Sequence, residues 1–286
     1  MAYEGILINN RCEILKKIAF QGEKGAFSEE AILSFFDSQI VTQPCNFLND
    51  VFRVVESGKA DMGMVPVENS IEGSINQTYD LLLTSNLKIC GEFILRINHN
   101  LIANFNVDIT KIKKVYSHPQ ALAQCRKFLE SLRVEQIPFY DTAGSVKMIH
   151  DNRHDDAAAI GRKRAAEEYN MKILSESIED SSYNYTRFLV LNKDDYEITG
   201  NDKTSVVFST NYIPGALHKV LGEFVERNIN LTKIESRPIR NKVWEYTFFV
   251  EIEGYRTEIK IIESLKQLSK FTLFTKILGS YPKSHN

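Results

Sequence analysis

Residues 60–83, ADMGMVPVENSIEGSINQTYDLLL, contain the unit from which most of the chain is built. An apolar run up to Val67 ends in the polar residues Glu68, Asn69 and Ser70, and a short turn leads into INQTYDLLL. This order of residues predicts a buried strand, then a turn, then a helix.

The same order recurs on both sides of this unit. The apolar segments KKIAFQG (16–22), KVYSH (114–118) and AAAIG (157–161) each precede a segment with helical character. KICGEFILRINHNLIA (88–103) is expected to be one long paired strand, and YTRFLVL (185–191) closes the region. Strands separated by helices predict parallel α/β layers, in which ligands bind where strand ends meet helix N-termini.

The composition excludes several classes of protein. The 286 residues correspond to about two domains, and 35 Lys and Arg against 37 Asp and Glu give a net charge of −2. This balance indicates no nucleic-acid partner and no membrane partner. No run of about 20 apolar residues is present, and the N-terminus lacks a secretory pattern, so a cytoplasmic protein is expected.

The usual motifs of metal and cofactor sites are missing. Cys12, Cys45, Cys90 and Cys125 form no C-x-x-C pair and are expected to be core residues. No glycine-rich nucleotide-binding motif, H-E-x-x-H motif or G-x-S-x-G motif occurs. Neither a metal nor another cofactor is therefore predicted.

The pattern changes after a polar linker at residues 192–202. Beyond it, strands and helices are expected in the order βαββαβ, which is the ferredoxin-like arrangement of two helices on one face of an antiparallel sheet. The predicted segments are 203–210, 214–228, 229–239, 242–254, 257–270 and 271–279. In the first helix one buried stripe is predicted, formed by Leu217, Val220, Leu221, Phe224 and Val225.

Small and amide-bearing polar residues collect at the predicted strand ends of the first region. They are Glu68, Asn69, Ser70, Ser117, His118, Gln120, Asp141, Thr142, Asn184, Thr186 and Arg187. Several precede helices, whose free N–H groups attract anions, so they could converge on one acidic ligand. Taken singly, each motif is also explained by helix capping, for which Ser28 and Thr142 are candidates, and Arg187 by a surface ion pair. These residues alone indicate a two-domain protein with an α/β cleft suited to anions.

Six segments in this order resemble the prephenate dehydratase family: GEKGAFSEEA, MVPVENSIEGSI, YSHPQALAQC, DTAGSVKM, AAAIGRKRAAEEY and NYTRFLVL. PGALHKVL and ESRP resemble the ACT regulatory domain. The resemblance implies a two-lobed, periplasmic-binding-protein-like catalytic domain over 17–191 and a ferredoxin-like ACT domain over 203–280. Two features depart from the family pattern, namely Ser145 in place of alanine and the extension 1–16.

The resemblance implies that prephenate loses carbon dioxide and hydroxide to give phenylpyruvate, a step toward phenylalanine. Family assignments of catalysis or binding correspond to Thr186, Glu68, Asn69, Gln124 and Ser117, of which we expect Ser117 to bind substrate and the other four to serve catalysis. We expect Ser70, Thr142, Arg187 and Phe188 to bind substrate as well. We expect Thr186 to donate a hydrogen bond to the departing oxygen, with protonated Glu68 or water behind it. We further expect Arg187 to bind the carboxylate of the pyruvyl side chain rather than the one that leaves.

For the C-terminal domain the resemblance implies a site for L-phenylalanine as allosteric inhibitor between paired ACT domains. Its residues are Gly215, Ala216, Leu217, Glu235, Ser236, Arg237 and Pro238. A homodimer or homotetramer is then expected, although the domain could also serve dimerisation alone. Two other functions stay open: an arogenate dehydratase, which performs the same elimination on the amino analogue, and a non-catalytic amino acid sensor.

Overall fold

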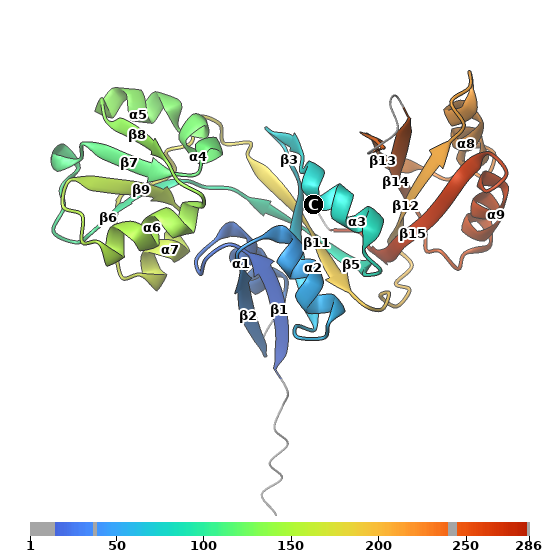
Figure 1. The fold of residues 1–286 in the computed structure, drawn as a ribbon, viewed down its shortest axis with the longest axis horizontal. Coiled ribbons are helices and arrows are strands. Elements are labelled where there is room, and N and C mark those ends of the chain that lie inside the picture. Colours follow the sequence, from blue (N-terminus) through green and yellow to red (C-terminus); the bar gives the residue numbers. More distant parts are fainter. Residues whose placement is uncertain (1–14, 37–38, 240–244, 285–286) are drawn as a thin grey trace, which may run out of the picture.

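The computed structural model describes residues 15–36, 39–239 and 245–284. Three bodies follow one another along the long axis of the molecule (Figure 1). We call them the central lobe, the outer lobe and the C-terminal domain. The expected mixed architecture of a two-lobed α/β region and a separate βαββαβ domain is confirmed.

The central lobe is built on a mixed sheet with the order β2-β1-β3-β11-β5, in which the short β4 pairs with β3. Strand β1 is parallel to β2 and β3, as expected for parallel layers, whereas β11 is antiparallel to β3 and β5, so the sheet is mixed and the expectation fails for β11. The strands are β1 (Lys16–Gln21), β2 (Ile40–Cys45), β3 (Met62–Asn69), β4 (Gly73–Ser74), β5 (Lys88–Arg96) and β11 (Tyr185–Asn192). The helices are α1 (Phe27–Phe35), α2 (Leu48–Glu56) and α3 (Asn76–Thr84).

The outer lobe contains a second sheet, with the order β10-β6-β9-β7-β8. Its strands are β6 (Asn100–Ala103), β7 (Lys114–Ser117), β8 (Glu135–Pro138), β9 (Ala157–Gly161) and β10 (Lys172–Ser175). Its helices are η1 (Ile109–Lys111), α4 (Pro119–Gln124), α5 (Arg126–Leu132), α6 (Thr142–Asp151) and α7 (Lys163–Glu168). Strand β9 is buried along its whole length, which agrees with its run of small apolar residues.

Two segments cross between the lobes and form a hinge. The strand predicted over 88–103 is in fact two strands, β5 and β6, because the chain leaves one sheet and enters the other at residues 97–99. The returning segment 176–184 runs beside it, with Ile97 N–H donating to the carbonyl of Asn184 and Ile178 N–H donating to that of His99. The alternating pattern continues through the break, so the sequence alone does not reveal the change of partner.

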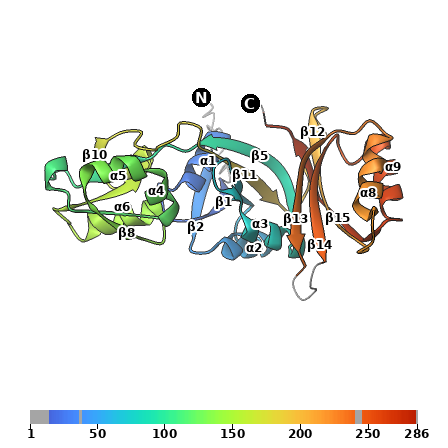
Figure 2. The same cartoon turned by 90° about the horizontal axis from the view of Figure 1, so that it is seen from above.

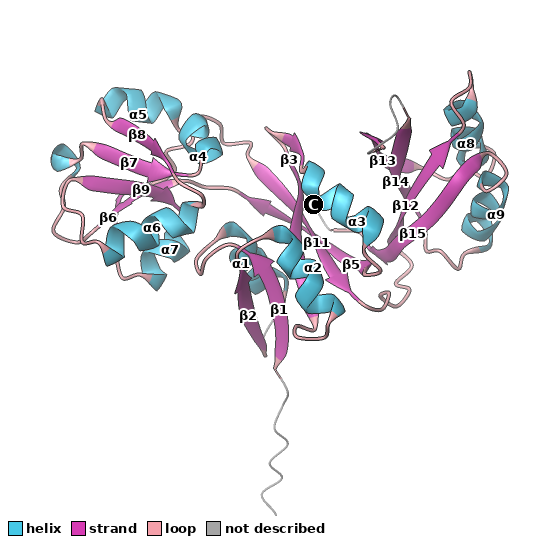
Figure 3. Ribbon diagram, in the orientation of Figure 1, coloured by secondary structure: helices cyan, strands magenta, loops and turns pink. Residues whose placement is uncertain are grey.

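The C-terminal domain has the predicted order βαββαβ, with the sheet order β13-β14-β12-β15 (Figure 3). Its elements are β12 (Asp202–Thr210), α8 (Ala216–Val225), β13 (Leu231–Pro238), β14 (Tyr246–Glu253), α9 (Ile259–Leu268) and β15 (Thr272–Pro282). The first residues of the segment predicted at 242–254 lie outside the described residues, as does Cys12.

The apolar stripe of α8 is narrower than predicted. Val220 and Phe224 are fully buried and Leu217 and Leu221 pack against them, but Val225 is 74% exposed. Val225 is the last residue of α8, so the helix ends before this side chain is covered.

The C-terminal domain docks on the central lobe through the sheet face that its helices leave open, as Figure 2 shows from above. Val207, Phe249, Leu278 and Tyr281 belong to the same buried cluster as residues of the central lobe. Strand β15 comes so close to β5 that a Cβ atom at Gly279 would overlap the carbonyl oxygen of Ile89. The two domains therefore share one buried apolar cluster, and the C-terminal domain has a second cluster of its own between its sheet and its helices.

We expect Gly279→Ala to lower the free energy of unfolding by about 1–3 kcal/mol, the usual effect of overpacking a tight contact. Gly222→Ala in α8 is the matched control, because its added methyl group meets no atom within 4 Å. This control should be neutral or stabilising by about 0.5–1 kcal/mol. Urea unfolding of both variants checks this, and an unchanged midpoint for Gly279→Ala would contradict the tight packing.

Candidate active site

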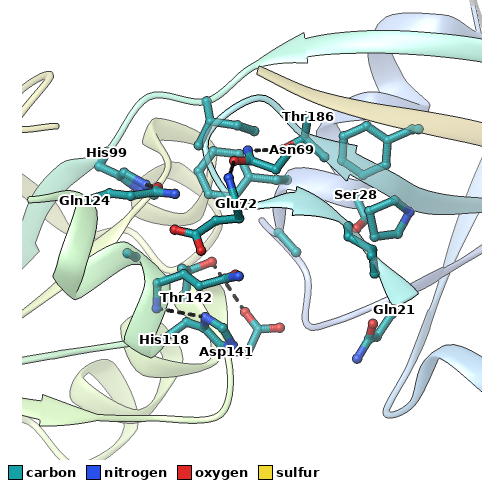
Figure 4. A pocket seen from close by; sticks show the side chains of 18 of the residues that line it. Gln21, Ser28, Asn69, Glu72, His99, His118, Gln124, Asp141, Thr142 and Thr186 are labelled. Carbon is teal, nitrogen blue, oxygen red and sulfur yellow. Dashed lines mark hydrogen bonds between the residues drawn. The ribbon is translucent and has the colours of Figure 1, made fainter. Parts of the chain in front are cut away.

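A cavity of about 400 Å³ lies where the two lobes meet the hinge (Figure 4). Its walls come from the ends of β3 and β11, from the start of helices in both lobes, and from the hinge itself. Of the predicted catalytic and substrate-binding residues, five line it: Asn69, Gln124, Thr142, Thr186 and Phe188.

A chain of hydrogen bonds joins the two lobes along one wall of this cavity. Asn69 Nδ2 donates to Thr186 Oγ1 at 3.0 Å and to Asn184 Oδ1 at 2.8 Å. Asn184 Nδ2 in turn donates to Gln124 Oε1 at 2.8 Å, and His99 Nε2 lies 2.9 Å from the same oxygen. Because the Thr186 oxygen accepts a hydrogen bond from Asn69, the Thr186 hydroxyl hydrogen is left to donate to a bound molecule.

His99 sits in the hinge at the end of this chain and is only 2% exposed. The Gln124 oxygen is an acceptor, so Nε2 carries the proton, while Nδ1 is buried and has no hydrogen-bond partner among the described residues. Burial lowers the pKa of the imidazole. His99 is therefore neutral near pH 7, and its protonation would place a second N–H where nothing in the described structure accepts it.

Helix N-termini are the groups at the cavity wall that can attract an anion. No Lys or Arg is among the described residues that line it, whereas Glu72 and Asp141 are. Helices α1 and α3 begin at its wall, and neither has a side chain capping its first N–H groups. The prediction that Ser28 caps α1 is thus wrong, because the N-cap is Ala26. Uncapped N-termini attract carboxylates through free N–H groups and the helix dipole.

Helix α6 behaves differently, because its N-terminus is already occupied. The Asp141 carboxylate accepts from the backbone N–H groups of Ala143 and Gly144, so Asp141 rather than Thr142 is the cap. Burial raises the pKa of Asp141, and these N–H groups oppose the rise. Ser145, the departure from the family pattern, is fully buried and donates to the Thr142 carbonyl, so it does not face the cavity.

Four predicted site residues do not reach the cavity. Ser117 is buried and donates to the Ile160 carbonyl, and Ser70 donates to the Tyr183 carbonyl beside the hinge. Glu68 and Arg187 lie on the opposite face of the central sheet from Asn69 and Thr186, because consecutive side chains of a strand alternate between faces.

On that opposite face Glu68 accepts from Lys233 at 2.7 Å, while Arg187 contacts Glu92 and Glu251. The expectations that Glu68 is a proton source and that Arg187 holds a substrate carboxylate are therefore corrected. Burial would raise the pKa of Glu92, but Arg187 and Lys203 outweigh burial and hold it below its ordinary value.

The residues predicted to bind phenylalanine are divided between two places. Gly215, Ala216 and Leu217 line a second cavity of about 600 Å³ beside β14, and Gly215 takes the left-handed conformation at the N-cap of α8. Segment 235–238 does not line it. Glu235 accepts from Ser74 and Arg237 pairs with Asp80, so both face the central lobe, while Ser236 is exposed and Pro238 borders a third cavity.

His99, Glu72 and Gln21 also line the active-site cavity but are absent from the predicted site. Asn184 was recognised only as a polar residue at a strand end. His99 and Asn184 belong to the two crossing segments, and the hidden break in the segment 88–103 is the reason that the sequence gives no role to His99. Cys45, Cys90 and Cys125 are buried, as predicted.

The geometry defines a two-lobed α/β protein with a small-molecule cleft at its hinge and a ferredoxin-like module docked on one lobe. The model of the prephenate dehydratase family matches residues 18–196, and that of the ACT domain matches residues 213–270. The chain belongs to the prephenate dehydratase family, whose members are carbon–oxygen lyases, and carries an ACT domain.

Three relatives show how far the similarity extends. The chain is 45% identical to a bifunctional chorismate mutase/prephenate dehydratase of Aquifex aeolicus, over 94% of this chain and 74% of the relative. It is 42% identical to a prephenate dehydratase of Methanocaldococcus jannaschii, over 93% and 98%. It is 40% identical to arogenate dehydratase/prephenate dehydratase 2 of Arabidopsis thaliana, over 93% and 72%.

Two solved structures resemble the whole chain. A prephenate dehydratase from Arthrobacter aurescens in complex with L-Phe has a TM-score of 0.85 and 32% identity, covering 93% of this chain and 90% of that one. A structure described as a novel type of quorum quenching acylase, GqqA, has a TM-score of 0.86 and 29% identity, covering 94% and 98%. No helix among the described residues is long and apolar enough to cross a membrane.

The buried neutral histidine predicts a dependence of stability on pH. Below an ordinary histidine pKa of about 6.5 the unfolded chain binds a proton that folded His99 does not bind, so stability falls as the pH drops through this range. The contribution approaches about 1.4 kcal/mol per pH unit. We expect the fall to be smaller in His99→Gln, which keeps a donor for Gln124. Urea unfolding at about pH 7.5 and about pH 5.5 measures this, and equal slopes for both proteins would contradict it.

Proposed function

We propose that the cleft converts prephenate to phenylpyruvate by loss of carbon dioxide and hydroxide, with Thr186 as the donor to the departing oxygen. The hydrogen bond from Asn69 to Thr186 inside the cavity carries this proposal, because it orients the threonine hydroxyl. The bond between the ring and the leaving carboxylate breaks and carbon dioxide departs, while the electron pair of that bond stays in the ring and shifts its double bonds. The ring hydroxyl leaves as hydroxide with the electron pair of its own C–O bond. Formation of the aromatic ring drives the step.

Thr186 acts through hydrogen bonding rather than as a strong acid. A threonine hydroxyl is a poor proton donor by pKa, but a fixed dipole aimed at developing negative charge stabilises the transition state. Asn69, Asn184 and Gln124 hold this dipole in place through the chain of amide hydrogen bonds. Water takes over the role expected of Glu68, since Glu68 is paired with Lys233 on the other face.

Helix N-termini hold the substrate carboxylates in this proposal. The free N–H groups of α1 and α3 attract an anion without the tight bidentate grip of an arginine. Strong binding of the carboxylate that leaves would stabilise the substrate more than the transition state. The described part of the chain places no arginine at the cleft wall, which is consistent with this requirement.

Arogenate is the second candidate substrate, because relatives of this chain carry both arogenate and prephenate in their names. The carboxylates of Glu72 and Asp141 at the cavity would also tolerate an ammonium group. Purified enzyme should be compared on the two substrates by their specificity constants. A higher specificity constant on prephenate supports the proposal, and a higher specificity constant on arogenate would make the chain an arogenate dehydratase.

L-Phenylalanine is proposed as the allosteric inhibitor, binding beside Gly215, Ala216 and Leu217. The ACT domain and the related structure with L-Phe support this assignment. Within one chain, segment 235–238 does not line the cavity beside these residues, so a complete site of all seven residues requires a second copy. A homodimer or homotetramer is accordingly proposed, and light scattering of the purified protein tests it.

We expect Thr186→Ala to lower kcat by about 10²–10³, the usual loss on removing one such donor, with little change in KM. Thr186→Ser keeps the hydroxyl and serves as the control, with a much smaller loss. The appearance of phenylpyruvate absorbance from prephenate provides the assay. Near-normal turnover in Thr186→Ala would end the proposed role of this residue.

We expect Gly215→Val to abolish inhibition by L-phenylalanine. Valine is strained at the positive φ of 78° and its side chain covers the backbone that would meet the ligand. Gly222→Ala on the same helix is the control and should keep a normal inhibition curve. Dose-dependent inhibition that persists in Gly215→Val would refute this position for the inhibitor.

A further inference from the structure

Seven charged side chains line a pocket between the central lobe and the C-terminal domain, on the face of the sheet away from the cleft, and one of them, Lys283, pairs with Glu253. We call the other six the ion cluster: Glu68, Glu92, Arg187, Lys203, Lys233 and Glu251. Three acidic and three basic groups balance its charge. They come from β3, β5 and β11 of the central lobe and from β12, β13 and β14 of the C-terminal domain.

Arg187 contacts one carboxylate of each domain, Glu92 of the central lobe and Glu251 of the C-terminal domain. Its Nη2 lies 2.7 Å from both carboxylate oxygens of Glu251, and its Nε donates to Glu92 at 2.8 Å. The side chains of Arg187, Glu92 and Glu251 are 13%, 2% and 10% exposed. Lys203 also contacts both carboxylates, at 2.8 Å and 3.6 Å. Charges this deeply buried are fixed by their partners, because separation would leave a carboxylate unpaired away from water.

Thr186 precedes Arg187 in β11, and its side chain points to the cleft instead. Strand β11 changes its register against β3 between Arg187 and Phe188. Such irregularities redirect the neighbouring side chains of a strand. Arg187 and Thr186 are thus consecutive residues of one strand, and their side chains lie on opposite faces of it.

We propose that Arg187 is a positioning residue that fixes the Thr186 hydroxyl for catalysis, and that Glu251 of the C-terminal domain is the partner on which this positioning depends. This inference rests on the function proposed for Thr186. It makes the docked C-terminal domain part of the catalytic geometry, in addition to any role in inhibition. It also replaces the expectation that Arg187 binds substrate.

The two roles of Arg187 predict different kinetics. A residue that binds substrate raises KM when it is replaced and leaves kcat near normal. A positioning residue lowers kcat and leaves KM nearly unchanged, because substrate still binds but the donor is displaced. A displacement of about 1 Å can cost about 100-fold in rate.

The decisive variant is Glu251→Gln, whose side chain lies outside the cleft and keeps its shape while losing its charge. We expect kcat on prephenate to fall by about tenfold to a hundredfold with KM nearly unchanged. Arg187→Lys should show the same split. The double variant should be no slower than Arg187→Lys alone, because both changes remove one interaction.

Arg256→Gln is the matched control. Arg256 pairs with Asp195 at 2.7 Å and thus also joins the C-terminal domain to the rest of the chain, but it does not belong to the ion cluster. Its kcat should stay near that of the wild type. Thermal unfolding and L-phenylalanine binding report whether each variant remains folded and docked.

The outcomes distinguish failure of the positioning role from failure of the proposed function. Active wild type with an unchanged kcat in Glu251→Gln overturns the positioning role alone. A raised KM with normal kcat in Arg187→Lys overturns it as well and restores the substrate-binding role. Wild type that is inert on both prephenate and arogenate overturns the proposed function, and the positioning role with it.

Discussion

Strand β11 imposes the constraint on which the cleft and the domain interface both depend. It lies between β3 and β5 in the central sheet, and its alternating side chains face two different environments. Thr186 and Phe188 line the cleft, whereas Arg187 is buried among carboxylates of two domains. Consecutive side chains of a strand point to opposite faces of the sheet, so a strand that turns one side chain toward the cleft turns the next one to the other face. The polar chemistry of the cleft and the ionic contact of the domains are therefore fixed together.

This alternation also explains which parts of the site could be predicted from the sequence. The strands, the βαββαβ order and the cleft residues Asn69, Gln124 and Thr186 followed from apolar runs, polar strand ends and family motifs. The motifs E-N-S and T-R-F, however, each contain residues from two faces of a sheet. The residue types of these motifs do not indicate which face of the sheet borders the cleft, because the position of the cleft depends on the neighbouring strands and on the docked domain. Glu68 and Arg187 were assigned to the wrong face for this reason.

The remaining differences between the predicted and the observed structure arise where tertiary contacts determine the local structure. The break between β5 and β6 depends on which sheet supplies the next partner, so the residues 88–103 gave no sign of a hinge or of the role of His99. The cap of α6 is Asp141 instead of its neighbour Thr142, although both residue types favour that position. Val225 is apolar and close to the predicted stripe, but α8 ends there and exposes it.

The C-terminal domain reaches the cleft through two separate contacts. On β14, Glu251 binds Arg187 beside Thr186, and on β13, Glu235 accepts a hydrogen bond from Ser74, which lines the cavity. Both strands belong to one sheet, and Tyr246 and Phe248 of β14 also border the cavity proposed for the inhibitor. A ligand affects a distant site only by favouring one of two arrangements of an element that touches both. The sheet of the C-terminal domain meets this condition, since any change in its docking alters two strands of the central-lobe wall of the cleft at once, β4 and β11.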